Sequence, residues 1–202
     1  MSLRFAITFD YLCPFARNAN EHVIAGLLDG ADWDVTFTPF SLMQSHVEPG
    51  DADVWDRDEP DRVSGLLALQ ASVAVREKWA DHFLDVHERL FAARHDHGLD
   101  IKNPEVVGEA LGAAGLDAGE VFEVVATGVP LETVRTEHTV AATERHVWGV
   151  PTFVTDTRAV FVRVMDRPDG DGTLARQRVE QIVDLVDGTV ALHEFKQADL
   201  PM

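Results

Sequence analysis

TFDYLCPFA, residues 8–16, brings the only cysteine of the chain to the point where an apolar strand pattern gives way to a helical one. Pro14 suits the first position of that helix, because its missing N–H would have no partner there. The side chain of Cys13 would then face unpaired backbone N–H groups and the positive end of the helix dipole, which both favour a thiolate. A buried structural cysteine is the alternative, and it is the commonest fate of a free cysteine.

A strand, a helix and a second strand are predicted around this motif. Residues 3–9 are rich in aromatic and β-branched side chains, and from Pro14 onward apolar residues recur at helical spacing until Asp29-Gly30. Residues 33–40 alternate with period two and end near Pro39. The pattern predicts a βαβ unit with parallel strands and a right-handed crossover.

A helical stretch separates this unit from the remaining strands. Residues 48–61 hold seven acidic residues and are expected to form an exposed loop that carries Trp55. Residues 63–91 predict two helices with a break near Glu77-Lys78, and three more helices are expected to begin at Asn103-Pro104, Asp117 and Pro130, the last running to about Val147. We therefore expect an all-helical insertion over residues 60–147.

Sequence patterns typical of strands return after the helical insertion. Residues 150–154 and 159–164 predict a hairpin, residues 174–186 a final helix, and residues 189–202 an edge segment. The fold class is therefore predicted to be α/β, with a mixed central sheet. One discontinuous domain would comprise residues 1–59 and 148–202, and the helical insertion would interrupt it.

Composition narrows the possible partners. The chain has 202 residues, 46% of them hydrophobic, and 35 acidic against 17 Lys and Arg residues give a formal charge of −18. Such a charge disfavours nucleic acids and anionic lipids. The sequence shows neither a signal-peptide pattern nor the ~18 consecutive apolar residues of a membrane span. We expect a cytoplasmic protein whose single cysteine stays reduced.

The order βαβ, helical insertion, ββα, with DYLCPF at residues 10–15 and GVPTFV at residues 149–154, resembles the DsbA-like branch of the thioredoxin fold. That branch includes the 2-hydroxychromene-2-carboxylate isomerases and the kappa-class glutathione transferases. The segment from Leu90-Phe91 to Gly98 also resembles this family, and the resemblance covers nearly the whole chain.

The resemblance implies that Pro151 is preceded by a cis peptide bond and lies across from the thiol of Cys13. Val150 would then offer its backbone groups to an extended substrate. DsbA-like oxidoreductases carry Cys-x-x-Cys, whereas Ala16 stands in place of the second cysteine here. A two-cysteine exchange cycle is therefore excluded.

The expected function is a thiol oxidoreductase or thiol-transfer enzyme that acts through Cys13. Its co-substrate would be a low-molecular-weight thiol, mycothiol or glutathione, with no tightly bound cofactor, and its substrate a small molecule or a peptide. An isomerase-like or kappa-transferase-like enzyme, in which Cys13 contacts only the thiol of the co-substrate, is one alternative. A non-catalytic thioredoxin-fold binding module is another, and a homodimer is compatible with the helical insertion.

Further candidate residues surround the motif. Tyr11, Pro14, Phe15 and Val150 are expected to contact the substrate or the thiol. Aromatic and sulfur side chains predicted to line an apolar pocket with them are Phe9, Met43 and Trp148. His146 is a candidate acid or base because it precedes Gly149-Val150-Pro151 by about one turn. The histidines expected on solvated helix surface, with no metal-binding role, are His82, His87, His95 and His97.

Overall fold

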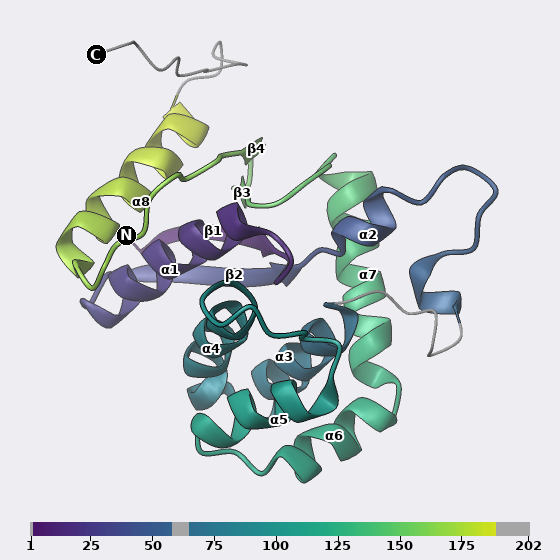
Figure 1. The fold of residues 1–202 in the computed structure, drawn as a ribbon. Coiled ribbons are helices and arrows are strands. Elements are labelled where there is room, and N and C mark those ends of the chain that lie inside the picture. The colour runs from purple at the N-terminus through teal and green to yellow at the C-terminus, as the bar shows by residue number, and fades with distance from the viewer. Residues whose placement is uncertain (1, 58–64, 189–202) are drawn as a thin grey trace, which may run out of the picture.

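The computed structural model describes residues 2–57 and 65–188. Its N-terminal unit consists of β1 (Leu3–Phe9), α1 (Pro14–Leu28) and β2 (Trp33–Pro39), and β1 and β2 pair in parallel. The burial of β2 alternates along the strand as its sequence predicts. The predicted βαβ unit is confirmed (Figure 1).

Two short strands complete a mixed sheet. β3 (Thr152–Val154) lies antiparallel to β1 and to β4 (Ala159–Phe161), which gives the order β2-β1-β3-β4. Both strands are shorter than predicted: the residues before Thr152 form a loop that contains the Val150–Pro151 bond, and β4 ends at Phe161 rather than at residue 164. The final helix, α8 (Gly172–Gly188), packs against α1, while the edge segment expected at residues 189–202 lies outside the described residues.

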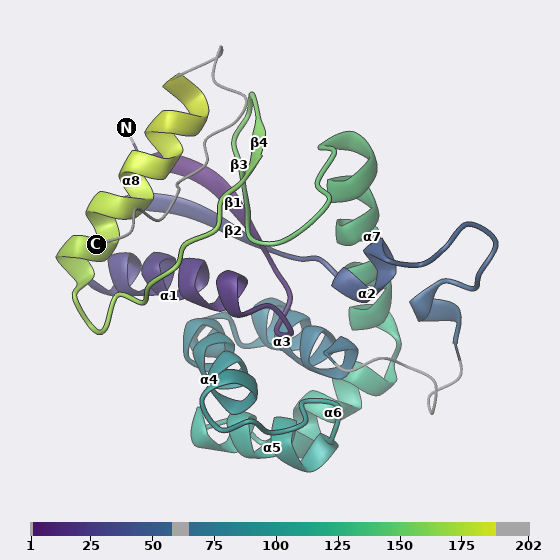
Figure 2. The ribbon, with the colours of Figure 1, turned by 45° about the horizontal axis from the view of Figure 1, so that its top comes forward.

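The inserted region is helical, as predicted. Its elements are α3 (Leu66–Lys78), the short 3₁₀ helix η3 (Ala80–His82), α4 (Phe83–His95), α5 (Pro104–Ala113), α6 (Ala118–Ala126) and α7 (Val129–Glu144). The break falls at Trp79, directly after the predicted Glu77-Lys78. Figure 2 shows the insertion below α1, with α7 running back beside the short helix α2 (Leu42–Ser45).

The acidic segment after β2 differs from its prediction. It contains α2 and a 3₁₀ turn, η1 (Val54–Asp56), and Trp55 is buried rather than carried on an exposed loop. The ring of Trp55 packs edge-on against His138 of α7, with 5.2 Å between ring centroids. The acidic neighbours remain at the surface while the indole joins the core, so the expectation of a fully exposed loop is wrong.

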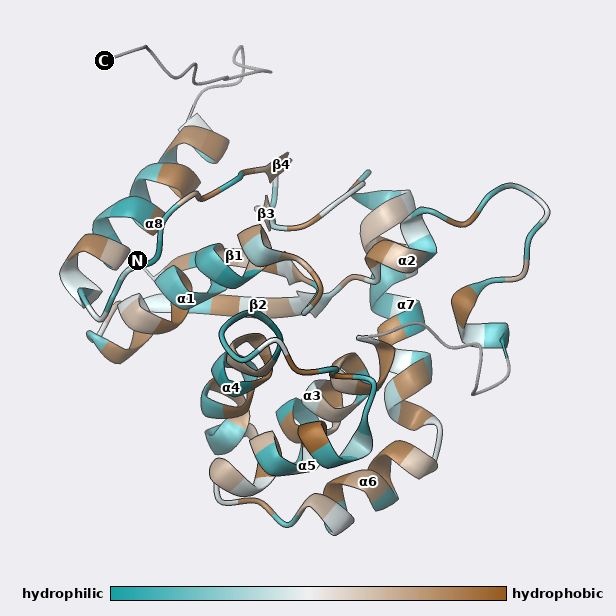
Figure 3. Ribbon diagram, viewed as in Figure 1, coloured by the Kyte–Doolittle hydropathy of each residue, from teal (hydrophilic) through white to brown (hydrophobic). Residues whose placement is uncertain are grey.

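Buried residues of β1 and of α1 itself fix the N-terminal end of α1, where Cys13 lies. Phe5, Ile7 and Phe9 of β1 are buried, and the middle of α1 is almost entirely buried. Figure 3 shows both apolar and polar residues along α1, α8 and the helices of the insertion, as expected of helices that bury one face. The N-terminus of α1 therefore meets the carboxyl end of β1 at a fixed position, where Cys13 lies.

Candidate active site at the N-terminus of helix α1

Cys13 is the N-cap residue of α1. Its backbone is extended, and its Sγ accepts the N–H of Ala16 at 3.4 Å, so the side chain occupies the position of a capping oxygen. The N–H of Cys13 donates to the carbonyl of Asp10 at 3.0 Å, which closes the turn between β1 and α1. The side chain is 8% exposed and therefore reaches the surface only at its edge.

The thiol also contacts the loop before β3. Its S–H donates to the carbonyl oxygen of Val150, with 3.4 Å between sulfur and oxygen. The Val150–Pro151 peptide bond is cis, as the family resemblance implied. The N–H of Thr152 donates to Oγ1 of Thr8 at 2.9 Å, which fixes this loop against the end of β1.

Opposing influences act on the pKa of the Cys13 thiol. Burial is the largest influence, and it raises the pKa of the Cys13 thiol above its ordinary value. The N–H groups of Ala16 and Phe15 and the charge of Arg163 lower this pKa, whereas Asp10 raises it, and the net direction is upward. The expected stabilisation of the thiolate by the helix N-terminus is present, but desolvation outweighs it, so the net direction of the shift is toward the neutral thiol.

Asp10 is a component of the site that the sequence reasoning missed. Its carboxylate accepts the N–H of Leu12 at 2.9 Å and the N–H of Leu42 at 2.8 Å, and the residue is 1% exposed. Burial raises the pKa of Asp10 to about 6, against the lowering influence of both hydrogen bonds. The sequence did contain a signal for this role, because Asp10 is an acidic residue placed between an apolar strand and the cysteine.

Tyr11 does not line a pocket. The ring is fully buried, and its hydroxyl lies 2.7 Å from Nδ1 of His87 in α4. Nε2 of His87 lies 3.1 Å from Oδ1 of Asn20, which can only accept, so Nε2 carries the proton and Nδ1 accepts from Tyr11. Burial lowers the pKa of His87 to about 3, so the imidazole is neutral. Tyr11 thus joins the core rather than the site.

Three of the four histidines expected on the solvated helix surface instead contact other parts of the protein. His87 is fully buried, and His95 donates from Nε2 to the carbonyl of Tyr11 at 2.9 Å. Nδ1 of His82 lies 2.9 Å from the carbonyl oxygen of Ala114. The helical spacing of the histidines could not predict these contacts, because each contact joins residues that are distant in sequence.

Phe15 lies beside the thiol, on the first turn of α1. Its ring is half-buried and faces the guanidinium of Arg163, which lies 4.7 Å from the ring centroid. Trp148 is 69% exposed and packs on Phe161, with ring centroids 4.6 Å apart. Pro14 is exposed at the start of the helix. Aromatic surface therefore adjoins Cys13, although Phe9 belongs to the core.

His146 shows no link to the thiol. It is exposed, with a positive φ of 55° at the turn after α7. Among the described residues, no hydrogen bond or ion pair joins His146 to Cys13, and its charge is absent from the influences on the thiol. Its role as acid or base stays a prediction.

Within residues 2–57 and 65–188, no group of three or more histidine, cysteine or acidic side chains is arranged to hold a metal ion. A cavity of about 330 Å³ does lie beside α1, between Glu21 and the segment 167–172, but Cys13 does not line it. None of the described helices is both long enough and apolar enough to cross a membrane.

Known proteins share this fold with the chain. The model of the DSBA-like thioredoxin domain matches residues 6–170. No curated protein sequence matches the chain.

Solved structures share the architecture at low identity. A 2-hydroxychromene-2-carboxylate isomerase is 15% identical with a TM-score of 0.62, over 91% of this chain and 97% of the other. ScsC of Proteus mirabilis is 16% identical with a TM-score of 0.60, over 94% and 86% of the two chains. A periplasmic thioredoxin-like protein of Salmonella enterica serovar Typhimurium is 18% identical with a TM-score of 0.59, over 90% and 82%. At this identity the likeness establishes the fold.

Proposed function

The chain belongs to the DsbA-like thioredoxin-domain family, and on that premise we propose that it is an enzyme that uses a low-molecular-weight thiol, glutathione or mycothiol, at Cys13. The co-substrate is exchanged in each turnover, and the second substrate is a small molecule or a peptide. The cytoplasm is the compartment that we propose, because it is reducing and supplies such thiols. A chain with one cysteine forms no internal disulfide, so any second sulfur comes from the co-substrate.

The observation that carries the proposal is the contact between Cys13 and the cis-proline loop. Sγ lies between the N–H of Ala16 at 3.4 Å and the carbonyl of Val150 at 3.4 Å. A ligand sulfur that approaches Cys13 therefore meets backbone donors and acceptors from two elements at once. These groups are held in place by α1 and by the loop before β3, so binding requires little reorganisation.

The role that best fits the electrostatics is hydrogen-bond donation by a neutral thiol. Burial raises the pKa of Cys13, so its S–H is retained at neutral pH. When the co-substrate binds as a thiolate, that S–H turns from the carbonyl of Val150 to the incoming sulfur. The hydrogen bond stabilises the anionic sulfur, which attacks an electrophilic carbon of the second substrate; a carbon–sulfur bond forms, and the leaving group departs with its bonding electron pair, as chloride does from 1-chloro-2,4-dinitrobenzene. Cys13 itself forms and breaks no covalent bond.

A covalent role for Cys13 is the second candidate. It is favoured by Arg163 and by the N–H groups of Ala16 and Phe15, which lower the pKa of Cys13 against the effect of burial. Here the Cys13 thiolate attacks one sulfur of a disulfide, forms a mixed disulfide and releases the other sulfur as a thiolate. A low-molecular-weight thiolate then attacks the mixed disulfide, takes the bound sulfur and restores Cys13.

Cys13→Ser and Cys13→Ala variants distinguish these roles. Two reactions are measured with glutathione and with mycothiol: conjugation to 1-chloro-2,4-dinitrobenzene and reduction of hydroxyethyl disulfide. Donation by a neutral thiol predicts that Cys13→Ser keeps conjugation within about tenfold of the wild type, whereas Cys13→Ala loses it. The covalent role predicts that both variants lose disulfide reduction and that wild-type protein purified without reductant carries a thiol adduct in its intact mass.

The proposal itself fails if the wild-type protein accelerates neither reaction and neither thiol raises its melting temperature. That result would favour a non-catalytic binding module.

A further inference from the structure

Four side chains form a continuous row in the order Trp148, Phe161, Arg163 and Phe15, and the row ends on the first turn of α1, two residues after Cys13. The rings of Trp148 and Phe161 are 4.6 Å apart between centroids. The guanidinium of Arg163 lies 5.8 Å from the Phe161 centroid and 4.7 Å from that of Phe15. We call this set the aromatic–arginine row. It combines an exposed indole, a cation and the first turn of α1.

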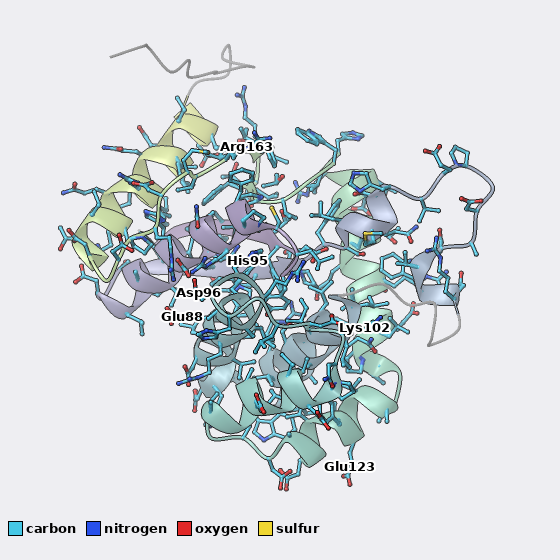
Figure 4. The ribbon with its side chains drawn as sticks, in the orientation of Figure 1. Glu88, His95, Asp96, Lys102, Glu123 and Arg163 are labelled. Carbon is cyan, nitrogen blue, oxygen red and sulfur yellow. The ribbon has the colours of Figure 1, made fainter. Side chains whose placement is uncertain are left out.

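Two hydrogen bonds fix the segment that carries Arg163. The N–H of Val162 donates to the carbonyl of Pro151 at 3.1 Å, and Nδ2 of Asn18 donates to the carbonyl of Val164 at 3.1 Å. Arg163 is therefore anchored on one side to the cis-proline loop and on the other to α1. Figure 4 shows Arg163 at the β3–β4 end of the molecule, away from Lys102 and Glu123 of the helical insertion.

The charge of Arg163 is left available for a ligand. Arg17 and Arg167 pair with Glu21, and Arg178 pairs with Asp166. By contrast, no carboxylate forms an ion pair with Arg163 in the part of the chain that the structure describes, and the residue is exposed. A guanidinium stacked on an aromatic ring still presents its N–H groups at its edge, where they match the two oxygens of a carboxylate.

We infer that Arg163 binds a carboxylate of the co-substrate, so that the thiol used at Cys13 is an anionic one such as glutathione rather than an uncharged one such as mycothiol. This inference rests on the proposed function and specifies its co-substrate. Trp148 and Phe161 offer apolar surface to the remainder of the ligand. The formal charge of the chain is −18, so attraction of an anion to this place depends on the local cation.

Glutathione and its diethyl ester provide the test, because they share the thiol and differ in their carboxylates. Calorimetric titration at low salt measures both affinities for the wild type, Arg163→Gln, Arg163→Lys and Arg4→Gln. Arg4 is an exposed arginine paired with Asp34 at the opposite end of β1 and serves as the matched control.

The wild type should bind glutathione about tenfold more tightly than the diester, the size expected of one charge-assisted hydrogen-bonded contact. The net negative charge of the protein favours the diester, whose carboxylates are masked, and therefore opposes the expected preference for glutathione. Arg163→Gln should abolish the preference, Arg163→Lys should retain part of it, and Arg4→Gln should behave as the wild type. Mycothiol should bind the wild type and Arg163→Gln equally.

Equal binding of glutathione and the diester by the wild type would overturn the inference, and so would a preference that survives in Arg163→Gln. In both cases the proposed function would stand, because thiols still bind. Absence of binding for all three thiols would overturn the proposed function and the inference with it.

Discussion

Asp10 and Cys13 are joined in the turn between β1 and α1, and the charge of the Asp10 carboxylate opposes ionisation of the Cys13 thiol. The N–H of Cys13 donates to the backbone carbonyl of Asp10 at 3.0 Å, and the charge of Asp10 contributes to the raised pKa of Cys13. Asp10 itself has a pKa raised to about 6 by burial. The acid thus holds the turn through its hydrogen bonds and opposes formation of the thiolate through its charge.

Replacing Asp10 with Asn should lower the pKa of Cys13, because the negative charge that repels the thiolate is lost while most of the side-chain volume is kept. The rate of alkylation by iodoacetamide as a function of pH measures this. Asp34→Asn, at an exposed position where β2 begins, is the control and should leave the profile unchanged. A profile of Asp10→Asn that coincides with the wild type, or lies at higher pH, would contradict the electrostatic role of Asp10.

Asp10 should also make stability depend on pH in a defined window. The ordinary pKa is 3.8 and the folded-state value is about 6, so the folded state binds the extra proton. The contribution of Asp10 is fully present below pH 3.8 and is lost as the pH rises through about 6, on the order of 3 kcal/mol. Urea unfolding between pH 4 and pH 7 should show the wild type losing about 2 kcal/mol of stability relative to Asp10→Asn, because part of the contribution is already lost at pH 4. Parallel pH dependences in the two proteins would count against it.

The buried contact between Tyr11 and His87 fastens the helical insertion to the strand that precedes the site. His87→Leu should reduce the free energy of unfolding by roughly 1–3 kcal/mol, because it leaves the amide oxygen of Asn20 without this partner and removes one of the two side-chain partners of the Tyr11 hydroxyl, the other being Ser72. Adding Tyr11→Phe should cost less than the same change in the wild type, since the Tyr11–His87 hydrogen bond is already absent. Chemical denaturation of the two single variants and the double variant gives the coupling, and strictly additive losses would argue against a shared hydrogen bond.

A second set of contacts fixes α1 through Glu21. Its side chain is 3% exposed and accepts from Nε of Arg17 at 3.0 Å and from Arg167 at 2.6 and 2.7 Å, while both arginines also reach Asp96 at the end of α4. Glu21→Gln should cost about 3 kcal/mol of unfolding free energy, because it breaks a buried pair from one side.

Asp85→Asn is the matched control for this substitution. Asp85 pairs with Arg89 at the surface of α4, with side chains 47% and 42% exposed, so the change should be within about 0.5 kcal/mol. Thermal or urea unfolding compares the two variants. Similar losses in both would show that the buried network contributes no more than a surface pair.

The order of elements was predictable from the sequence because each element carries a local signal. β2 alternates, α1 begins at Cys13-Pro14 and ends before Gly30, and the break after Lys78 follows the change in apolar spacing. The cis bond before Pro151 was implied by the resemblance rather than by any property of the dipeptide alone.

The electrostatics of the site were not predictable in the same way. The position of Cys13 at a helix N-terminus was foreseen, but its pKa depends on how deeply the insertion and the loop before β3 bury it. Likewise Tyr11 meets His87 across 76 residues of sequence, and Arg163, which follows β4, meets Phe15 at the start of α1. Such contacts arise from tertiary packing, which local periodicity does not encode.

The central claim is that Cys13 acts as a neutral thiol, and the pH dependence of its alkylation in the wild-type protein tests it most directly. Because Cys13 is the only cysteine, loss of free thiol or gain of mass with iodoacetamide reports on this residue alone. We predict an inflection above the ordinary thiol pKa of about 8.5. An inflection below that value would contradict the account and would identify Cys13 as an activated nucleophile.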